Sequence, residues 1–307
     1  MQPGCPTKTA EPTLARVAGR ERSGVWAAWA ELVKARLTSL VLLTTLVGYY
    51  LAVSGPVDGA GLASTLVGMA LLAGGGAALN EWMEREADAC MPRTRHRPLP
   101  AGRIRPGTAL FAGVGMALGG LAVLAWGGHP VAAGLGAVTL VAYLGLYTPL
   151  KRVTWWNTLV GAVPGALPPV VGWAAVQGEV PAAAWTLFGI VACWQMPHFF
   201  GIAWLYREDY ARAGFRMLPQ VDPGGRRTAR QAVLWTMALL PVSLSPWWLG
   251  VAGKLYAVAA VVLGGAYLVA ALRFARTRSN PDARRLFLAS IVYLPLLLVF
   301  LTIDKVR

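Results

Sequence analysis

The chain of 307 residues is 56% hydrophobic but only 14% charged, whereas soluble globular proteins usually carry about 25% charged residues. This composition excludes an ordinary soluble protein. The formal net charge of +14 arises from 28 Lys and Arg residues against 14 Asp and Glu residues. An excess of positive charge can indicate nucleic-acid binding, but the distribution of the charge along this chain argues against it.

The N-terminal residues 1–24 contain Pro, Thr, Arg and Glu but no hydrophobic stretch. They therefore do not resemble a secretory signal peptide, and we expect them to form a flexible cytoplasmic tail. The remaining residues, 25–307, are expected to form one transmembrane domain.

Mostly apolar windows follow one another through the rest of the chain, each close to the roughly 20 residues that cross a bilayer as a helix. Because backbone polar groups in lipid must be satisfied within the segment, these windows predict α-helices. We therefore expect an all-α, polytopic membrane protein with nine transmembrane helices. The windows are residues 37–54, 60–80, 108–127, 130–148, 157–177, 182–204, 232–252, 255–272 and 286–303.

The basic residues alternate between the two predicted sides of the membrane. If the N-terminus is cytoplasmic, 25 of the 28 Lys and Arg residues lie on the cytoplasmic side, and the opposite side holds only Lys254, Lys305 and Arg307. This asymmetry is typical of membrane proteins and supports nine spans, with the C-terminus opposite the N-terminus. The short loops and plain tail favour a bacterial cytoplasmic membrane over a mitochondrial one. We expect membrane lipid, and not nucleic acid, as a partner of the charged surface.

A cluster of acidic and amide residues begins where the second window ends, in the stretch NEWMEREAD. Asn80, Glu84 and Asp88 are four residues apart, so a helix places them on one face. Several arginines follow directly, and oxygen ligands beside guanidinium groups suit a Mg²⁺–diphosphate group. The alternative is a helix end whose charges are simply solvated.

A second long polar loop has the same order of charges. Two predicted cytoplasmic loops, residues 81–107 and 205–231, each begin acidic and become basic, and they are four spans apart. This spacing suggests two similar halves, each of which contributes ligands over one active site. In the second loop the acidic residues are Glu208 and Asp209, in YREDY.

Basic residues at the predicted cytoplasmic helix ends are candidates for binding an anion, although most such residues serve membrane topology. Arg97 precedes Pro98, which restricts its backbone, and Lys151 directly follows a span. Arg36 lies at the entrance to the first span. Arg93, Arg152 and Arg207 complete this group.

Histidine occurs within a predicted span only at His198, in the stretch CWQMPHFFGIAW. Its aromatic neighbours include Trp194 and Phe199, and this environment suits a flat macrocycle, an isoprenoid chain or a developing carbocation. A hydrogen-bonded interior histidine is the alternative. Three prolines in the fifth window, Pro164, Pro168 and Pro169, predict a kink.

Four stretches resemble the UbiA superfamily of intramembrane prenyltransferases, and within it the branch that prenylates heme. The similarity extends over nearly all of residues 30–303. The stretches are NEWMEREADACMPRTRHRPLPAGRI, YTPLKRVTWWNTLVGAVPGALPPVVGWAAV, CWQMPHFFGIAW and YREDYARAGFRMLP. The sequence departs from the pattern in carrying Glu84 and Glu86 where the heme branch usually has aspartate. Tyr206 and Tyr210 stand near positions where the wider superfamily has paired aspartates.

The resemblance implies a UbiA-type bundle around a central cavity that transfers a farnesyl group from farnesyl diphosphate to the vinyl group of heme B. It also implies a Mg²⁺ cofactor, and downstream partners such as a heme A synthase or oxidase assembly proteins. The metal ligands and catalytic residues would be Asn80, Glu84, Asp88 and Asp209. The diphosphate-binding residues would be Arg36, Arg93, Arg97, Lys151, Arg152 and Arg207. The heme or prenyl pocket would include His198, Trp194, Phe199, Tyr147, Asn157, Tyr206 and Tyr210.

Three other functions are compatible with parts of the sequence. A prenyltransferase for another acceptor, such as an aromatic quinone precursor or a chlorophyll-like ring, would share the first stretch. A transporter would share the many spans, although transporters more often place their ligands near the membrane midplane. A structural assembly factor for a respiratory oxidase would tolerate replacement of the carboxylates.

Overall fold

The computed structural model describes residues 24–306. The regular secondary structure of these residues consists of helices. In chain order they are α1 Val25–Leu32, α2 Ala35–Ala52, α3 Gly59–Ala89, α4 Pro106–Gly127, α5 Pro130–Val141, the π-helix η1 Ala142–Tyr147, α6 Thr148–Val153, α7 Asn157–Ala166, α8 Pro168–Gln177, α9 Ala182–Leu205, α10 Arg207–Arg212, α11 Leu218–Val221, α12 Arg226–Trp248, α13 Lys254–Thr277 and α14 Asn280–Ile303. The predicted all-α fold is confirmed. The predicted tail, apart from Gly24, lies outside the described residues.

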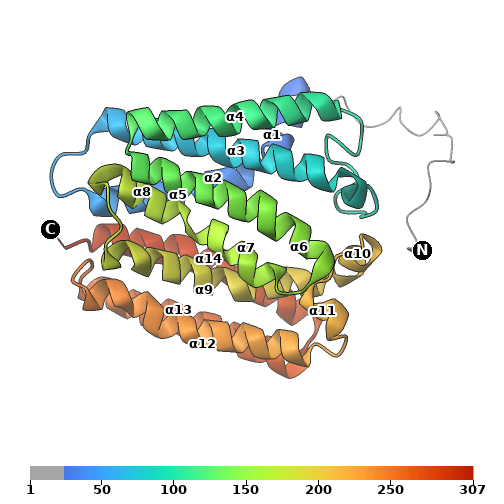
Figure 1. Cartoon of the computed structure of the whole chain (residues 1–307). Coiled ribbons are helices and arrows are strands. Elements are labelled where there is room, and N and C mark those ends of the chain that lie inside the picture. The colour runs from blue at the N-terminus through green and yellow to red at the C-terminus, as the bar shows by residue number, and fades with distance from the viewer. Residues whose placement is uncertain (1–23, 307) are drawn as a thin grey trace.

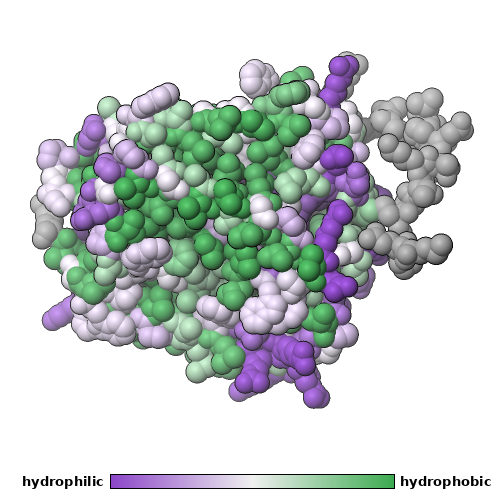
Figure 2. Space-filling view, in the orientation of Figure 1, coloured by the Kyte–Doolittle hydropathy of each residue, from purple (hydrophilic) through white to green (hydrophobic). Residues whose placement is uncertain are grey.

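Eight helical segments within residues 24–306 are long and apolar enough to cross a membrane. Two of them are composite, since α5, η1 and α6 make one span, as do α7 and α8. The remaining predicted span falls on α12, a helix of 23 residues that begins at Arg226 and carries two more arginines near its start. Beyond the arginines, Gln231, two prolines and two serines lower the hydropathy of α12. The prediction of nine spans therefore holds only approximately. Figure 2 shows an apolar surface over the middle of the bundle and hydrophilic residues gathered toward its two ends.

The long helices lie side by side (Figure 1), with α3 against α4, α2 against α8, and α9 against α12 and α14. The connections 90–105 and 206–225 lie at the same end of this bundle, beside α6, α10 and α11. We call this end the arginine-rich end. Met91 of the first connection packs in one apolar cluster with Phe215 and Met217 of the second, so the two predicted loops do meet.

Glycines set the close approach of α3 to α4. A Cβ atom at Gly75 would lie 2.7 Å from the carbonyl oxygen of Gly113, and one at Gly120 would lie 2.7 Å from that of Gly68. Because real Cβ atoms do not come this close to backbone, only glycine permits the contact. The approach holds the polar end of α3 firmly inside the bundle.

Two irregularities in the helices shape the interior. The fifth span breaks between Ala166, where α7 ends, and Pro168, where α8 begins, and α7 also contains Pro164; this confirms the predicted kink. The fourth span contains the π-helical turn η1. Such turns are rare and often occur at functional sites.

Candidate active site

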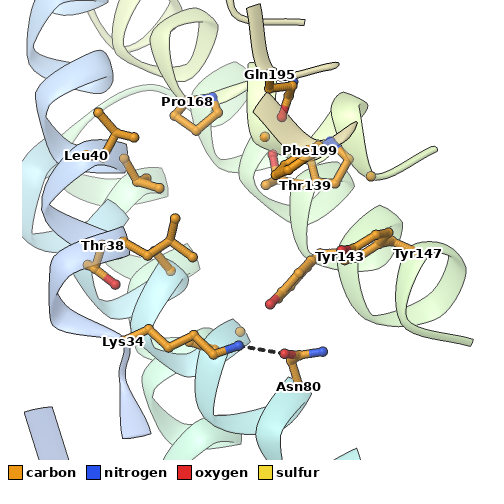
Figure 3. A pocket seen from close by; sticks show the side chains of 18 of the residues that line it. Lys34, Thr38, Leu40, Asn80, Thr139, Tyr143, Tyr147, Pro168, Gln195 and Phe199 are labelled. Carbon is orange, nitrogen blue, oxygen red and sulfur yellow. Dashed lines mark hydrogen bonds between the residues drawn. The ribbon is translucent and has the colours of Figure 1, made fainter. Parts of the chain in front are cut away.

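A pocket of about 410 Å³ extends from the arginine-rich end, where Arg93 and Phe215 line it, into the interior, where Met69 and Pro168 line it. Its walls come mainly from α2, α3, η1, α7 and α9. In Figure 3, Thr38 lies on the opposite wall from Phe199. The pocket therefore joins a charged entrance to an apolar interior.

Helix α3 continues to Ala89, nine residues beyond the predicted apolar window. The residues expected to begin the loop 81–107 are therefore helical, and this continuation aligns the predicted ligands. Asn80, Glu84 and Asp88 all line the pocket and are at most 5% exposed. Glu86, by contrast, points outward, with a side chain that is 80% exposed and paired with Arg85. The structure thus brings together three of the four predicted metal ligands.

Each of the two pocket carboxylates has its own cation. Lys151 Nζ lies 2.8 Å and 3.0 Å from the two carboxylate oxygens of Glu84. Arg97 Nη1 donates to Asp88 Oδ2 at 2.7 Å. The carboxylates are buried in both pairs, so neither charge is left without compensation.

Lys34 is a pocket residue that the sequence analysis missed. Its Nζ donates to Asn80 Oδ1 at 2.7 Å (Figure 3), and Asn80 in turn donates to Thr148 Oγ1 at 3.1 Å. Lys34 lies between α1 and α2 in the left-handed region, with φ 48°. A non-glycine residue there carries backbone strain of about 1 kcal/mol, and the turn places its side chain in the pocket.

The electrostatics of the entrance favour an anion. Among the described lining residues, four cations (Lys34, Arg93, Arg97, Lys151) accompany the two carboxylates. Burial, followed by the positive charges of Arg97 and Lys151, lowers the pKa of Lys34 to about 8. Burial alone would lower the pKa of Arg97, but the attraction of Asp88 outweighs it and raises this pKa. The excess of positive charge leaves room for the charge of a bound anion.

The π-helix η1 aligns three side chains of the fourth span. Tyr143, Tyr147 and Lys151 are spaced by four residues, and all three line the pocket. Four α-helical residues overshoot one turn by roughly 40°, whereas the wider π turn offsets this drift. Tyr143 and Tyr147 stack with ring centroids 5.8 Å apart, and Lys151 Nζ lies 4.5 Å from the Tyr147 ring. Tyr143 was not predicted, because no pattern in the sequence indicates the π turn.

Glu81 supports the basic connection from behind the pocket wall. It is fully buried, and its Oε1 accepts the backbone N–H of Leu99 at 3.3 Å. Its Oε2 has no hydrogen-bond partner within residues 24–306. Since Leu99 follows Arg97 by two residues, Glu81 helps to fix the segment that carries the Arg97–Asp88 pair.

The second polar region contributes aromatic rather than acidic groups. Tyr210 lines the pocket, and its hydroxyl accepts from Arg93 Nη2 at 3.4 Å. Tyr206 does not line the pocket; Arg93 lies over its ring at 4.7 Å. Asp209 is not among the described lining residues either, and its carboxylate lies 3.6 Å from Arg212. The physical reason is that α9 ends at Leu205 and α10 starts in a new direction, so the helical periodicity does not continue.

Several other predicted residues lie outside the pocket wall. Arg36 and Arg152 are exposed. Arg207 donates to Asn280 Oδ1 at 2.9 Å, which ties the start of α10 to the start of α14. Asn157 is fully buried, and its amide nitrogen donates to the carbonyl oxygens of Thr154 and Arg216. The prediction that Asn157 lines the pocket is therefore replaced by a role in holding two connections together.

The interior end of the pocket carries the predicted aromatic group. His198, Trp194 and Phe199 of α9 all line it. The His198 ring stacks on Trp194 with centroids 5.3 Å apart and meets Phe199 edge-on at 5.7 Å. Two aromatic rings thus pack against one polar ring.

The donor set fits Mg²⁺ delivered with an anionic substrate. No group of three or more His, Cys, Asp or Glu side chains that could hold a metal is found within the described part of the chain. Mg²⁺, however, commonly takes one or two carboxylates, with substrate phosphates and water completing its six oxygens. Glu84, Asp88 and the amide oxygen of Asn80 match that pattern.

Comparison with known sequences places this architecture among prenyltransferases. Residues 41–295 match the UbiA prenyltransferase family. A protoheme IX farnesyltransferase of Solibacter usitatus is 47% identical over 284 residues, which cover 90% of this chain and 97% of that protein. A protein of the same name from Opitutus terrae is 46% identical over 276 residues, covering 90% and 93%.

Solved structures share the fold at much lower identity. A structure of digeranylgeranylglyceryl phosphate synthase has a TM-score of 0.76 and 14% identity, covering 91% of this chain and 98% of that one. A UbiA homologue from Archaeoglobus fulgidus bound to GPP and Mg²⁺ has a TM-score of 0.65 and 15% identity, covering 90% and 99%. At these identities the likeness concerns the fold alone.

Proposed function

This chain belongs to the UbiA prenyltransferase family, and from that premise we propose that it transfers a farnesyl group from farnesyl diphosphate to the vinyl group of heme B. The products are heme O and diphosphate. The observation that carries the proposal is the single pocket that joins buried, paired charges to an aromatic interior. A substrate with a charged head and a long apolar tail matches both parts.

The charged entrance is assigned to the diphosphate and to Mg²⁺. Glu84, Asp88 and Asn80 would hold the metal, and Lys34, Arg93, Arg97 and Lys151 would contact the diphosphate oxygens. When bound, Mg²⁺ would neutralise charge that develops on the leaving diphosphate. Lys151 and Arg97 already touch the carboxylates, so small movements bring their donors toward an anion without new burial of charge.

The aromatic wall is assigned to the reacting carbon chain. Breakage of the C1–O bond leaves the electron pair on diphosphate and an allylic cation on the farnesyl group. The rings of Tyr143 and Tyr147 line the path between entrance and interior, where aromatic faces stabilise a cation. The apolar walls also exclude water until the new bond has formed.

The acceptor is assigned to the interior end. The π electrons of the heme vinyl group form the new C–C bond with C1 of the farnesyl group. The cation that remains beside the heme ring accepts a water molecule and releases a proton, which gives a hydroxyethylfarnesyl side chain. We assign His198 to contact with the heme, since it is the polar ring at this end of the pocket.

The orientation and partners follow from the same proposal. The many apolar helices make this an integral membrane protein. We propose that the arginine-rich end faces the cytoplasm of a bacterial cell, in agreement with the positive-inside asymmetry. Proteins that use heme O, such as a heme A synthase or oxidase assembly factors, would then be downstream partners.

The test is mass spectrometry of heme extracted from membranes that contain the chain and receive heme B, farnesyl diphosphate and Mg²⁺. We expect a product heavier than heme B by one farnesyl group and one hydroxyl group. A prenylated aromatic acid in place of prenylated heme would assign the chain to another acceptor. Accumulation of substrate in vesicles without any covalent product would indicate a transporter.

A further inference from the structure

A serine on α14 reaches across to the histidine on α9. His198 Nδ1 and Ser290 Oγ lie 2.7 Å apart, and Ser290 is fully buried. The two residues are 92 positions apart in the chain, so the contact depends on the packing of α9 against α14. Ser290 itself is not among the described lining residues of the pocket.

The hydrogen bonds of Ser290 determine which nitrogen of His198 carries the proton. Ser290 Oγ donates its hydrogen to the carbonyl oxygen of Phe287, one turn earlier in α14, at 2.5 Å. A hydroxyl has one hydrogen to donate and lone pairs to accept with. With that hydrogen engaged, we assign Ser290 Oγ as the acceptor of His198 Nδ1–H, and a neutral imidazole carries only this one N–H. The second nitrogen, Nε2, is left with a free lone pair.

The orientation of the His198 ring is held by the same serine in a second way. The carbonyl oxygen of Ser290 accepts from Trp194 Nε1 at 2.7 Å, and Trp194 stacks on His198 with an interplanar angle of 26°. The ring of Phe287 lies on another side, with its centroid 5.0 Å from that of His198. The hydroxyl and the carbonyl of one residue thus fix both the imidazole and the ring that stacks on it.

The lone pair of Nε2 remains available in the pocket. His198 lines the pocket, and within the described part of the chain Nε2 makes no hydrogen bond, whereas Nδ1 is engaged by Ser290. A histidine that binds a metal typically donates its other N–H to a fixed acceptor, which sets the tautomer and raises the basicity of the ligand. His198 and Ser290 have this arrangement, with Nδ1 engaged and Nε2 free to bind a metal.

We infer that Ser290 is a positioning residue that presents His198 Nε2 to the iron of the heme substrate. This rests on the proposed function, because the iron is that of the acceptor. Coordination by Nε2 would anchor the macrocycle through its centre while its edge, which carries the vinyl groups, faces the rest of the pocket. The serine never touches the substrate; it acts through the histidine.

The test measures heme B binding and the spectrum of the bound heme in purified full-length protein. We expect the wild-type protein to show the electron paramagnetic and Raman signatures of a histidine-bound iron. Ser290→Ala should lose that signature and bind heme B about tenfold more weakly, the scale usual for loss of a group that orients a metal ligand. Ser290→Thr keeps the hydroxyl and should retain most of both properties.

Ser243→Ala is the matched control, because Ser243 is equally buried and donates to the carbonyl oxygen of Leu240, three residues earlier, at 2.9 Å. It should leave the spectrum and the affinity unchanged. Binding of farnesyl diphosphate at the entrance reports whether each variant is folded. If Ser290→Ala does not fold, Ser290→Thr provides the test.

The inference is overturned if Ser290→Ala keeps the wild-type spectrum and affinity. It is equally overturned if His198→Ala keeps them, or if Ser290→Thr behaves as a folded variant without the histidine signature. Failure of the proposed function gives a different result from failure of this inference. In that case wild-type membranes form no farnesylated heme, regardless of which ligand the iron has.

Discussion

The two polar regions at the arginine-rich end have the same order of charges along the sequence but different structures. At the end of α3, three polar side chains point into the pocket and the carboxylates pair with cations from other segments, Lys151 and Arg97. In the region after α9, Asp209 instead pairs with Arg212 within its own short helix. Similar composition therefore does not make the two regions equivalent.

The difference lies in where each helix stops. Helix α3 runs unbroken through the acidic residues to Ala89, so they inherit its orientation and its burial. Helix α9 stops at Leu205, before the acidic residues, and they fall on a separate six-residue helix. Among the described residues, a carboxylate lines the pocket only where a membrane-spanning helix carries it inward.

Asp88→Asn is expected to reduce heme O formation more than any other change that tests the contrast between the two polar regions. The change removes the negative charge of a buried side chain that we assign to the metal. It also removes the charge that pairs with Arg97, whose Nη1 lies 2.7 Å from Asp88 Oδ2. We expect heme O formation to fall on the order of 10²–10³-fold, as for loss of one preorganised charge-stabilising group. The measurement is heme O per unit of membrane-inserted protein. Glu86→Gln, on the exposed side of the same helix, should retain nearly normal turnover, and equal losses in both variants would contradict the assignment.

Lys151→Met probes the buried ion pair of the first region. Without Lys151 the Glu84 carboxylate is buried and unpaired, which destabilises the protein by about 3 kcal/mol. The double variant Lys151→Met, Glu84→Gln removes both charges, so it should recover most of that stability but not the activity. Thermal unfolding and product formation, measured on both single variants and the double variant, separate the two effects. Full activity in the double variant would show that neither residue contacts the substrates.

Part of this site could be predicted from sequence because its order is local. Asn80, Glu84 and Asp88 share a helical face by spacing alone, and the position of Lys151 directly after an apolar span placed it near the membrane surface. Lys34 was missed because it reaches the pocket through a left-handed turn between α1 and α2, whereas the sequence shows only an apolar window from residue 37. Asp209 was assigned by analogy with the first half, and spacing cannot reveal that a helix ends before it.

The pH dependence of Lys34 gives a prediction for the entrance of the pocket. Burial and neighbouring positive charge lower its pKa to about 8, so its ammonium group loses a proton as the pH rises through that value. Binding of farnesyl diphosphate without Mg²⁺ should therefore weaken above about pH 8, by at most about tenfold per pH unit for one proton. Equilibrium binding across about pH 6 to pH 10 measures this.

Lys34→Arg is the control for that titration, since a guanidinium stays charged over the whole range. Its affinity for farnesyl diphosphate should remain level where that of the wild type declines. A decline of the same size in both proteins would assign the titration to another group.

The smallest effect is expected for Asp209→Asn, and it bears most directly on the contrast between the two regions. The Asp209 carboxylate is 3.6 Å from Arg212 and does not reach the described pocket wall. Loss of such an ion pair is worth at most about 1 kcal/mol, so heme O formation should change by less than about fivefold.

A loss as large as that of Asp88→Asn would show that the connection after α9 closes over the substrates and carries Asp209 to the metal. In that case both regions supply ligands. A small loss, with the metal affinity unchanged, leaves the α3 carboxylates as the acidic ligands. The second region then contributes an aromatic wall through Tyr210, whose hydroxyl accepts from Arg93 of the first region.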